Sequence, residues 1–232
     1  MPQKKIIGDM FDRIAGSYDR LNHVLSFRTD RAWRRRSLRH VLDGQPLRIL
    51  DLACGTGDYA ICMARKAVPG THIVGVDLSE GMLRVMAAKV EDAGLDGMVT
   101  CRCGEAERLD FPDGSFDRVT VAFGVRNFED RQAALQEIRR VLSPGGRLVI
   151  LDLSQPRNVL IRAVFNLYFH RIAPLIGGMV SGDREAYRYL PASVAAFPPP
   201  EEWTAFMRDC GFIRVQHKAY TFGVCRLYIG EK

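Results

Sequence analysis

The sequence lacks the features of a metal-binding or an exported protein. Its six cysteines include no CxxC pair, and its five histidines are scattered without the spacing of metal ligands. We therefore expect neither a metal site nor a disulfide framework. No apolar run of the signal-peptide kind follows the N-terminal residues Met1 to Lys5. The absence of such a run predicts a cytoplasmic protein.

A long uninterrupted apolar run is also absent. The most apolar stretch, from Val159 to Val180, is broken by three basic residues and by Pro174, which makes it a poor bilayer span. A polar, proline-rich passage follows it. We interpret 155–200 as a helical cap inserted over a substrate site. Apolar residues make up 47% of the 232 residues, which predicts one globular domain over 1–232.

Short apolar runs alternate with helix-like patterns through the middle of the chain. This alternation is typical of a parallel, doubly wound sheet that is covered by helices on both faces. Five strands are predicted, at Leu47 to Leu52, His72 to Val76, Met98 to Cys103, Arg118 to Phe123 and Arg147 to Leu153. The helices between them are expected to begin near Tyr59 and to cover Ser79 to Ala93 and Arg131 to Leu142.

The two ends of the chain add to this sheet. A helix from Glu201 to Cys210 and strands at Ile213 to His217 and Val224 to Ile229 are predicted, and the short connection between the last two favours antiparallel pairing. Two N-terminal helices, over 9–25 and Thr29 to Leu42, are expected to form a helical lid within 1–44. The fold class is therefore α/β: a mostly parallel seven-stranded sheet with an antiparallel C-terminal strand.

A glycine-rich loop follows the first predicted strand. Gly55-Thr56-Gly57-Asp58-Tyr59-Ala60 satisfies the G-x-G-x-x-G/A pattern of dinucleotide-binding folds, and Asp77 lies near the spacing of a ribose-binding acid. Asp51 distinguishes the ligand, because a carboxylate beside the loop would oppose a pyrophosphate. S-adenosylmethionine (SAM) instead presents an ammonium and a sulfonium there. Asp77 would accept the ribose hydroxyls, and Gly104-Glu105-Ala106 would read the adenine.

Each of these elements also has an ordinary explanation. The glycines would serve a turn, Asp77 would cap the helix that follows, and Glu105 would be a solvated acid. All three in this order favour the methyl donor. The SAM site is expected to contain Asp51, Gly55, Thr56, Gly57, Asp77, Leu78, Glu105 and Ala106.

With these motifs the chain resembles the class I, Rossmann-like SAM methyltransferases, and within them the quinone-biosynthesis C-methyltransferases. The resemblance covers nearly the whole chain. Three segments carry it: Phe11-Asp12-Arg13-Ile14-Ala15-Gly16-Ser17-Tyr18-Asp19 with Asn22 and Ser26-Phe27 through Trp33-Arg34; Phe123-Gly124-Val125-Arg126-Asn127; and Arg188-Tyr189-Leu190-Pro191-Ala192-Ser193-Val194 with Phe197-Pro198. The sequence departs from the family at Ala122, where serine is frequent, and at Glu105, where asparagine or aspartate is common.

The resemblance implies C-methylation of a polyprenyl quinol, with demethylmenaquinol as the expected substrate and the 2-methoxy-6-polyprenyl-benzoquinol precursor of ubiquinone as the alternative. Arg126 would hold the developing oxyanion and Asn127 would orient the hydroxyl. Tyr18, Tyr187 and Tyr189 are candidate substrate contacts, with a purely structural core role as the alternative. A surface salt bridge to Glu129 or Asp130 is the alternative for Arg126.

The net charge of +6 is concentrated near the N-terminus, in six arginines between positions 28 and 39. With Phe27 and Trp33 they suggest a basic amphipathic face, which together with the apolar cap would contact the inner face of the cytoplasmic membrane. A solvated helix face is the alternative. Nucleic acid is not expected, because Phe123 to Asn127 stands where a base methyltransferase carries N/D-P-P-Y/F. A protein that only sequesters SAM, without transferring its methyl group, is a further alternative. A homodimer is a possible assembly.

Overall fold

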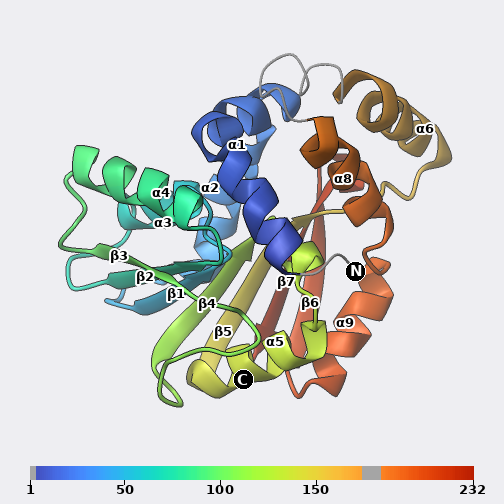
Figure 1. The fold of residues 1–232 in the computed structure, drawn as a ribbon. Helices are drawn as coiled ribbons and strands as arrows, with labels where there is room; N and C mark the ends of the chain where they lie inside the picture. Colours follow the sequence, from blue (N-terminus) through green and yellow to red (C-terminus); the bar gives the residue numbers. More distant parts are fainter. Residues whose placement is uncertain (1–3, 174–183) are drawn as a thin grey trace.

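The computed structural model describes residues 4–173 and 184–232, and these form a seven-stranded sheet in the order β3-β2-β1-β4-β5-β7-β6 (Figure 1). Its strands are β1 Arg48–Leu52, β2 His72–Asp77, β3 Val99–Cys103, β4 Phe116–Ala122, β5 Leu142–Leu153, β6 Ile213–Tyr220 and β7 Cys225–Glu231. Strands β1 to β5 pair in parallel, and β7 runs antiparallel to both of its neighbours, β5 and β6. The predicted fold class is confirmed.

Helices cover both faces of the sheet because successive strand residues point to opposite sides. In β1, Leu50 belongs to one core cluster and Ile49 to the other, and both are fully buried. The Leu50 cluster includes α5 (Arg131–Val141) and α9 (Pro200–Asp209). The Ile49 cluster includes α2 (Thr29–Val41), α3 (Asp58–Ala64) and α4 (Glu80–Asp92). The predicted helices agree with these bounds to within a residue or two.

The order of the strands places a crevice beside β1. From β1 the chain proceeds outward to β2 and β3, then returns to the other side of β1 and proceeds outward again through β4 and β5. Helices connecting the two series therefore diverge at the carboxyl ends of β1 and β4. Helices α1, α6 and α8 lie beyond this edge of the sheet (Figure 1).

Helix α1 runs over Lys4–Leu25 and so begins about a turn earlier than predicted. Its apolar face packs against Met82 of α4. Asp12 fastens the two helices, because its Oδ1 accepts hydrogen bonds from Ser79 Oγ at 2.5 Å and from the Gly81 N–H at 2.7 Å. Ser79 Oγ in turn accepts from the Met82 N–H at 3.0 Å, which makes Ser79 the N-cap of α4.

The inserted segment contains α6 (Val159–Leu167), the π-helical turn η2 (Tyr168–Ile172) and α8 (Arg184–Ala195). Phe165 and Phe169 form a small core with Val194 of α8. Tyr168 attaches this segment to the N-terminal helices, because its hydroxyl donates to the Leu25 carbonyl at 2.8 Å. Within the described ranges, no helix is both long and apolar enough to cross a membrane.

The predicted exposed face of α2 is wrong at two of its residues. Trp33 is 3% exposed and donates from Nε1 to Thr221 Oγ1 at 2.8 Å. Arg34 is also buried and lies 2.5 Å from Asp30. Trp33 is buried because α2 packs onto the sheet at this residue. The exposed arginines of this region are Arg28, Arg31, Arg35, Arg36 and Arg39.

The contact of Asp12 with α4 predicts a stability effect. Asp12→Ala removes the acceptor for two donors at the start of α4 and should lower the free energy of unfolding by about 1 kcal/mol. Asp9→Ala, on the same helix but with its side chain exposed, is the matched control and should have almost no effect. Urea denaturation followed by circular dichroism measures both variants. Equal stability of the two variants would show that Asp12 does not fasten α1.

Candidate functional site

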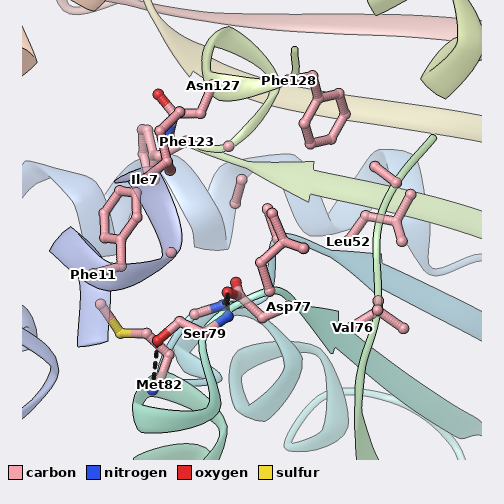
Figure 2. A pocket seen from close by; sticks show the side chains of 18 of the residues that line it. Ile7, Phe11, Leu52, Val76, Asp77, Ser79, Met82, Phe123, Asn127 and Phe128 are labelled. Carbon is pink, nitrogen blue, oxygen red and sulfur yellow. Dashed lines mark hydrogen bonds between the residues drawn. The ribbon is translucent and has the colours of Figure 1, made fainter. Parts of the chain in front are cut away.

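A cavity of about 770 Å³, including its open mouth, lies at the carboxyl ends of β1 to β4. Figure 2 shows Ile7 and Phe11 of α1 on one side of it and Leu52 and Val76 of the sheet on the other. Asp77 lies at the end of β2 between them. We call this space the donor cavity. Its lining also includes Tyr18, Ala53, Gly55, Leu78, Ser79, Met82, Gly104, Ala106, Glu107, Phe123, Gly124, Asn127 and Phe128.

The glycine loop brings its backbone against the end of β2. Gly57 has a φ of +81°, and a Cβ atom on it would lie 2.5 Å from Met86 Cγ. A side chain at this position would therefore displace the loop from α4. The neighbouring Gly55 N–H donates to Asp77 Oδ2 at 2.8 Å. The two glycines thus allow a close approach of the loop to the Asp77 carboxylate.

The Asp77 carboxylate is oriented by backbone donors. Besides the Gly55 bond to Oδ2, its Oδ1 accepts from the Ser79 N–H at 2.9 Å. Burial raises the pKa of this carboxyl, and the backbone hydrogen bonds oppose that rise. Each oxygen keeps a second lone pair, so the carboxylate can still accept bonds from a ligand diol. The helix cap is supplied by Ser79, and the alternative role of Asp77 as the cap is therefore wrong.

Asp51 lies deeper, on β1, and is 1% exposed. Thr120 Oγ1 donates to its Oδ1 at 2.6 Å, whereas its Oδ2 has no partner among the described residues. The side chain lines a small recess beside the donor cavity together with Gly55, Thr56 and Ala122. Burial raises the pKa of Asp51 to about 7. A buried carboxylate oxygen without a partner in such a recess fits a cationic group of a ligand.

Thr56 is tied to the N-terminal helix. Its hydroxyl donates to Asp19 Oδ1, and Lys89 Nζ donates to Asp19 Oδ2 at 2.7 Å and to Asp58 Oδ1 at 2.6 Å. Thr56 is 2% exposed and lines the recess but not the donor cavity. The network therefore holds α1 over the glycine loop through charged hydrogen bonds.

A second group of charges lies next to this network. His23 Nδ1 is 2.9 Å from Asp30 Oδ2, and His23 Nε2 is 3.5 Å from Asp58 Oδ2. Histidine and aspartate side chains can bind metals, and the ligand atoms of these three residues lie close together. The guanidinium of Arg34, however, lies 2.5 Å from Asp30 and 3.7 Å from Asp58. Arg34 already supplies the positive charge that the two carboxylates require.

Arg126 forms a buried ion pair with the end of β5. Its Nη1 lies 2.6 Å from Asp152 Oδ1, and its backbone N–H donates to Asp152 Oδ2 at 3.2 Å. Its Nε donates to Ser193 Oγ of α8 at 3.3 Å. Burial lowers the pKa of Arg126, but the Asp152 carboxylate together with Tyr18 and Tyr189 holds the pKa above its usual value. The predicted alternative, a surface pair with Glu129 or Asp130, is wrong.

The turn that carries Arg126, η1 (Val125–Asn127), separates the donor cavity from a second cavity. Arg126 lines the second one, and Asn127 lines the donor cavity. Tyr189 of α8 donates from its hydroxyl to Asn127 Oδ1 at 3.0 Å. Helix α8 thus contacts both side chains, through Ser193 and Tyr189 one turn apart.

The second cavity, which we call the acceptor cavity, measures about 1200 Å³ with its open mouth. Tyr18 and Phe123 line both cavities and so lie at their junction. Burial raises the pKa of the Tyr18 phenol, and Arg126 opposes that rise. The remaining walls are mostly apolar, from Leu25, Phe27, Trp33, Leu153, Ile161, Val164, Phe165, Tyr168, Phe169, Leu190 and Val224. The polar residues Asn22, Ser26, Thr29, Asp30, Arg34 and Thr221 complete the lining.

The predicted site residues thus fall into several groups. Gly55, Asp77, Leu78 and Ala106 line the donor cavity, as do Tyr18 and Asn127; Asp51 and Thr56 line the recess; Gly57 supports the loop. Arg126 lines the acceptor cavity, and Tyr189 bonds to Asn127 without lining either cavity. Glu105 is exposed, forms a β-bridge with Arg108 and does not line either cavity. The side chain of Tyr187 lies outside the described part of the structure.

Sequence reasoning missed several residues of the site. Glu107, rather than Glu105, lines the donor cavity, and its Oε1 accepts from the backbone N–H groups of Glu129 and Asp130. Asp152 and Ser193 were not singled out either. Asp152 did carry a signal, because it is a charged residue at the end of the apolar run Leu148 to Leu151.

Comparison with known proteins identifies relatives over the whole chain. The model of the ubiE/COQ5 methyltransferase family matches residues 2–232. A Thermus thermophilus protein named demethylmenaquinone methyltransferase is 47% identical over 96% of this chain and 100% of its own length. A Geobacter sulfurreducens protein named ubiquinone/menaquinone biosynthesis C-methyltransferase is 46% identical over 97% of this chain and 88% of its own.

Solved structures share the fold at lower identity. A SAM-dependent methyltransferase of Thermotoga maritima, described as a possible histamine N-methyltransferase, superposes with a TM-score of 0.67. It is 20% identical and covers 97% of this chain and 99% of its own. A likeness at this coverage and TM-score shows that the two chains share a fold.

The buried carboxyl of Asp51 predicts a pH-dependent stability. As pH rises from about 4 to 7 the unfolded chain ionises at this residue while the folded protein does not, so stability falls. Above pH 7 the penalty approaches about 4 kcal/mol, since one pKa unit corresponds to about 1.4 kcal/mol. Asp51→Asn avoids ionisation and should unfold at a higher temperature than wild type at pH 8, with a smaller gap at pH 5.

Thermal unfolding of Asp51→Asn, wild type and the exposed control Asp96→Asn at the two pH values measures this gap. The control should follow wild type at both. A gap that stays constant between pH 5 and pH 8 would show that Asp51 ionises normally in the folded protein.

Proposed function

The chain belongs to the ubiE/COQ5 methyltransferase family, and from this membership we propose that it methylates a ring carbon of demethylmenaquinol, a polyprenyl quinol, to give menaquinol. It is a SAM-dependent methyltransferase. The observation that carries the proposal is the pair of cavities that meet at Tyr18 and Phe123, one lined by an acid for a ribose and the other apolar. A methyl group can pass between two molecules that are held at such a junction.

The residues of the donor cavity fit SAM. Asp77 would accept the ribose hydroxyls, and the apolar walls at Val76, Leu78 and Ala106 would enclose the adenine. The Oδ2 atom of Asp51, which has no partner among the described residues, would balance the charge of the methionine end. Bound SAM supplies a methyl group that is already activated by its positive sulfur.

The acceptor cavity fits an apolar quinol with a long tail. Its walls are aromatic and aliphatic over most of their area, and it reaches the surface beside Phe27 and Val164, which line it and are 77% and 63% exposed. Arg126 and Tyr18 contribute polar groups at the inner end. A quinol ring at that end would have its hydroxyl near Arg126 while its tail followed the apolar walls outward.

Arg126 would act on the quinol as a fixed positive charge. A ring carbon becomes nucleophilic when the neighbouring hydroxyl loses its proton, and the resulting oxyanion needs a donor. The Asp152 carboxylate keeps the Arg126 guanidinium charged, so this arginine holds the oxyanion rather than removing the proton. Water in the cavity would accept the hydroxyl proton. Once the ring carbon has taken the methyl group, the hydrogen on that carbon would leave as a proton and the oxygen held by Arg126 would be protonated again, which restores the aromatic quinol. Asn127, held by Tyr189, would orient the reacting ring from the donor side.

A second candidate substrate is the methoxy-benzoquinol precursor of ubiquinone, because the name of the Geobacter relative includes ubiquinone biosynthesis. It differs from demethylmenaquinol in its head group. A methyl-transfer assay decides between them, with purified protein, methyl-labelled SAM and a short-chain form of each demethylated quinol. We expect a higher kcat/KM for the naphthoquinol. Exclusive use of the benzoquinol would replace the proposal by its alternative, and transfer to neither quinol would refute both.

The role of Arg126 predicts a kinetic defect with intact donor binding. Arg126→Lys keeps a charge beside Asp152 but loses the planar fork, and we expect kcat to fall by about 100-fold. Arg118→Lys, a half-buried arginine that pairs with Asp43 at the other end of β4, is the control and should retain activity. SAM binding, measured by calorimetry, should stay within a few-fold for both. A near-normal kcat for Arg126→Lys would contradict the assignment.

A further inference from the structure

Exposed apolar side chains gather around the mouth of the acceptor cavity. Phe27 is 77% exposed and Val164 is 63% exposed, yet both also line the cavity. Phe222, 79% exposed, follows Thr221, which is a lining residue too. We call these three residues, with Leu160 and Leu167 of α6, the rim. The surface of a protein in water seldom exposes so many large apolar side chains in one place.

Helix α6 is apolar on two sides. On its inner side, Ile161 and Phe165 line the acceptor cavity, as does Tyr168 of the turn η2 that follows. Leu160 and Leu167, which have Val164 between them at helical spacing, are 75% and 61% exposed. A helix that is apolar on both its inner and outer faces needs a second apolar environment. Figure 1 shows α6 at the outer edge of the molecule, beyond α8.

The two phenylalanines of the rim occupy turns with unfavourable backbone angles. Phe27 and Arg28 have φ of +51° and +60°, and Thr221 and Phe222 have φ of +44° and +56°. Each such residue costs on the order of 1 kcal/mol, because its Cβ crowds the backbone. Trp33 Nε1 donates to Thr221 Oγ1 and so ties the second turn to α2. Both turns therefore hold an aromatic side chain outward at the cavity mouth.

The segments that form the rim are basic, and the acidic Glu201 of α9 pairs with Arg157 and His217 in two of them. These three segments, 20–29, 154–173 and 217–226, contain no aspartate or glutamate. Exposed basic side chains flank the apolar groups at Arg28, Arg162, Arg171 and Lys218. An apolar surface within a basic border complements an anionic lipid headgroup layer above acyl chains.

We propose that the rim docks onto the surface of an anionic lipid bilayer, with Phe27, Phe222 and the outer side of α6 inserted among the acyl chains. The acceptor cavity then opens directly into the bilayer, so a polyprenyl quinol enters without crossing water. The docking surface is the rim of α6 and two turns. It keeps Phe27 and the apolar cap of the surface that the sequence suggested, adds Phe222, and leaves out Trp33, which is buried. This extends the proposed function by naming the surface from which its substrate arrives.

Sedimentation with vesicles tests the docking. Wild-type protein should bind vesicles of phosphatidylcholine with 30% phosphatidylglycerol at least tenfold more tightly than pure phosphatidylcholine, and high salt should weaken that binding. Leu160→Ser/Leu167→Ser and Phe222→Ser should each weaken it at least fivefold. Ile213→Ser, which replaces an exposed apolar residue of β6, is the matched control for Phe222→Ser and should bind as wild type does.

Enzyme assays keep this test apart from that of the proposed function. With a short-chain quinol in solution, the rim variants should turn over as wild type does, because Leu160, Leu167 and Phe222 do not line either cavity. With a long-chain quinol in anionic vesicles they should be at least fivefold slower. Rim variants that bind vesicles like wild type would overturn the docking proposal. A wild-type dimer that the rim substitutions dissociate would also overturn it, because a second copy would then cover the rim.

Discussion

The constraint on which the site depends is that the chain adds β2 and β3 on one side of β1, and then β4 and β5 on the other side. Two parallel strands that continue to opposite sides leave a crevice at their carboxyl ends, which neither helical layer can fill. The chain closes this crevice with segments from outside the alternating pattern. Asp12 and Asp19 fasten α1 over it, and Tyr189 fastens α8. The donor cavity is the space that these segments leave.

The buried ion pair Arg126–Asp152 determines which charge lies in the neighbouring acceptor cavity. Transfer of a guanidinium and a carboxylate out of water is unfavourable, and an apolar pair would often give equal or greater stability. The pair Arg126–Asp152 keeps a charged fork in a mostly apolar cavity, where its positive charge can stabilise an oxyanion. We attribute its presence to the reaction. The same pair sets the direction of η1, so that Arg126 and Asn127 face different cavities.

The sequence was sufficient for features that depend on local pattern. The strands, the helices between them and the loop at Gly55 and Gly57 follow from apolar runs and from backbone angles that favour glycine. Contacts between segments that are distant along the chain could not be predicted from the sequence. The partner of Arg126 lies 26 residues away on another strand, and Trp33 is buried because α2 packs on the sheet. Glu107 rather than Glu105 reaches the donor cavity because the chain turns after β3, and spacing alone does not determine that turn.

The central claim is that the Arg126 side of the junction directs the methyl group to carbon. It is tested most directly by nuclear magnetic resonance of the product made from ¹³C-methyl SAM and a short-chain demethylmenaquinol. We expect one labelled methyl group bonded to the ring carbon beside the hydroxyl. A labelled methoxy group would contradict it, because the oxyanion held by Arg126 would then itself be the nucleophile.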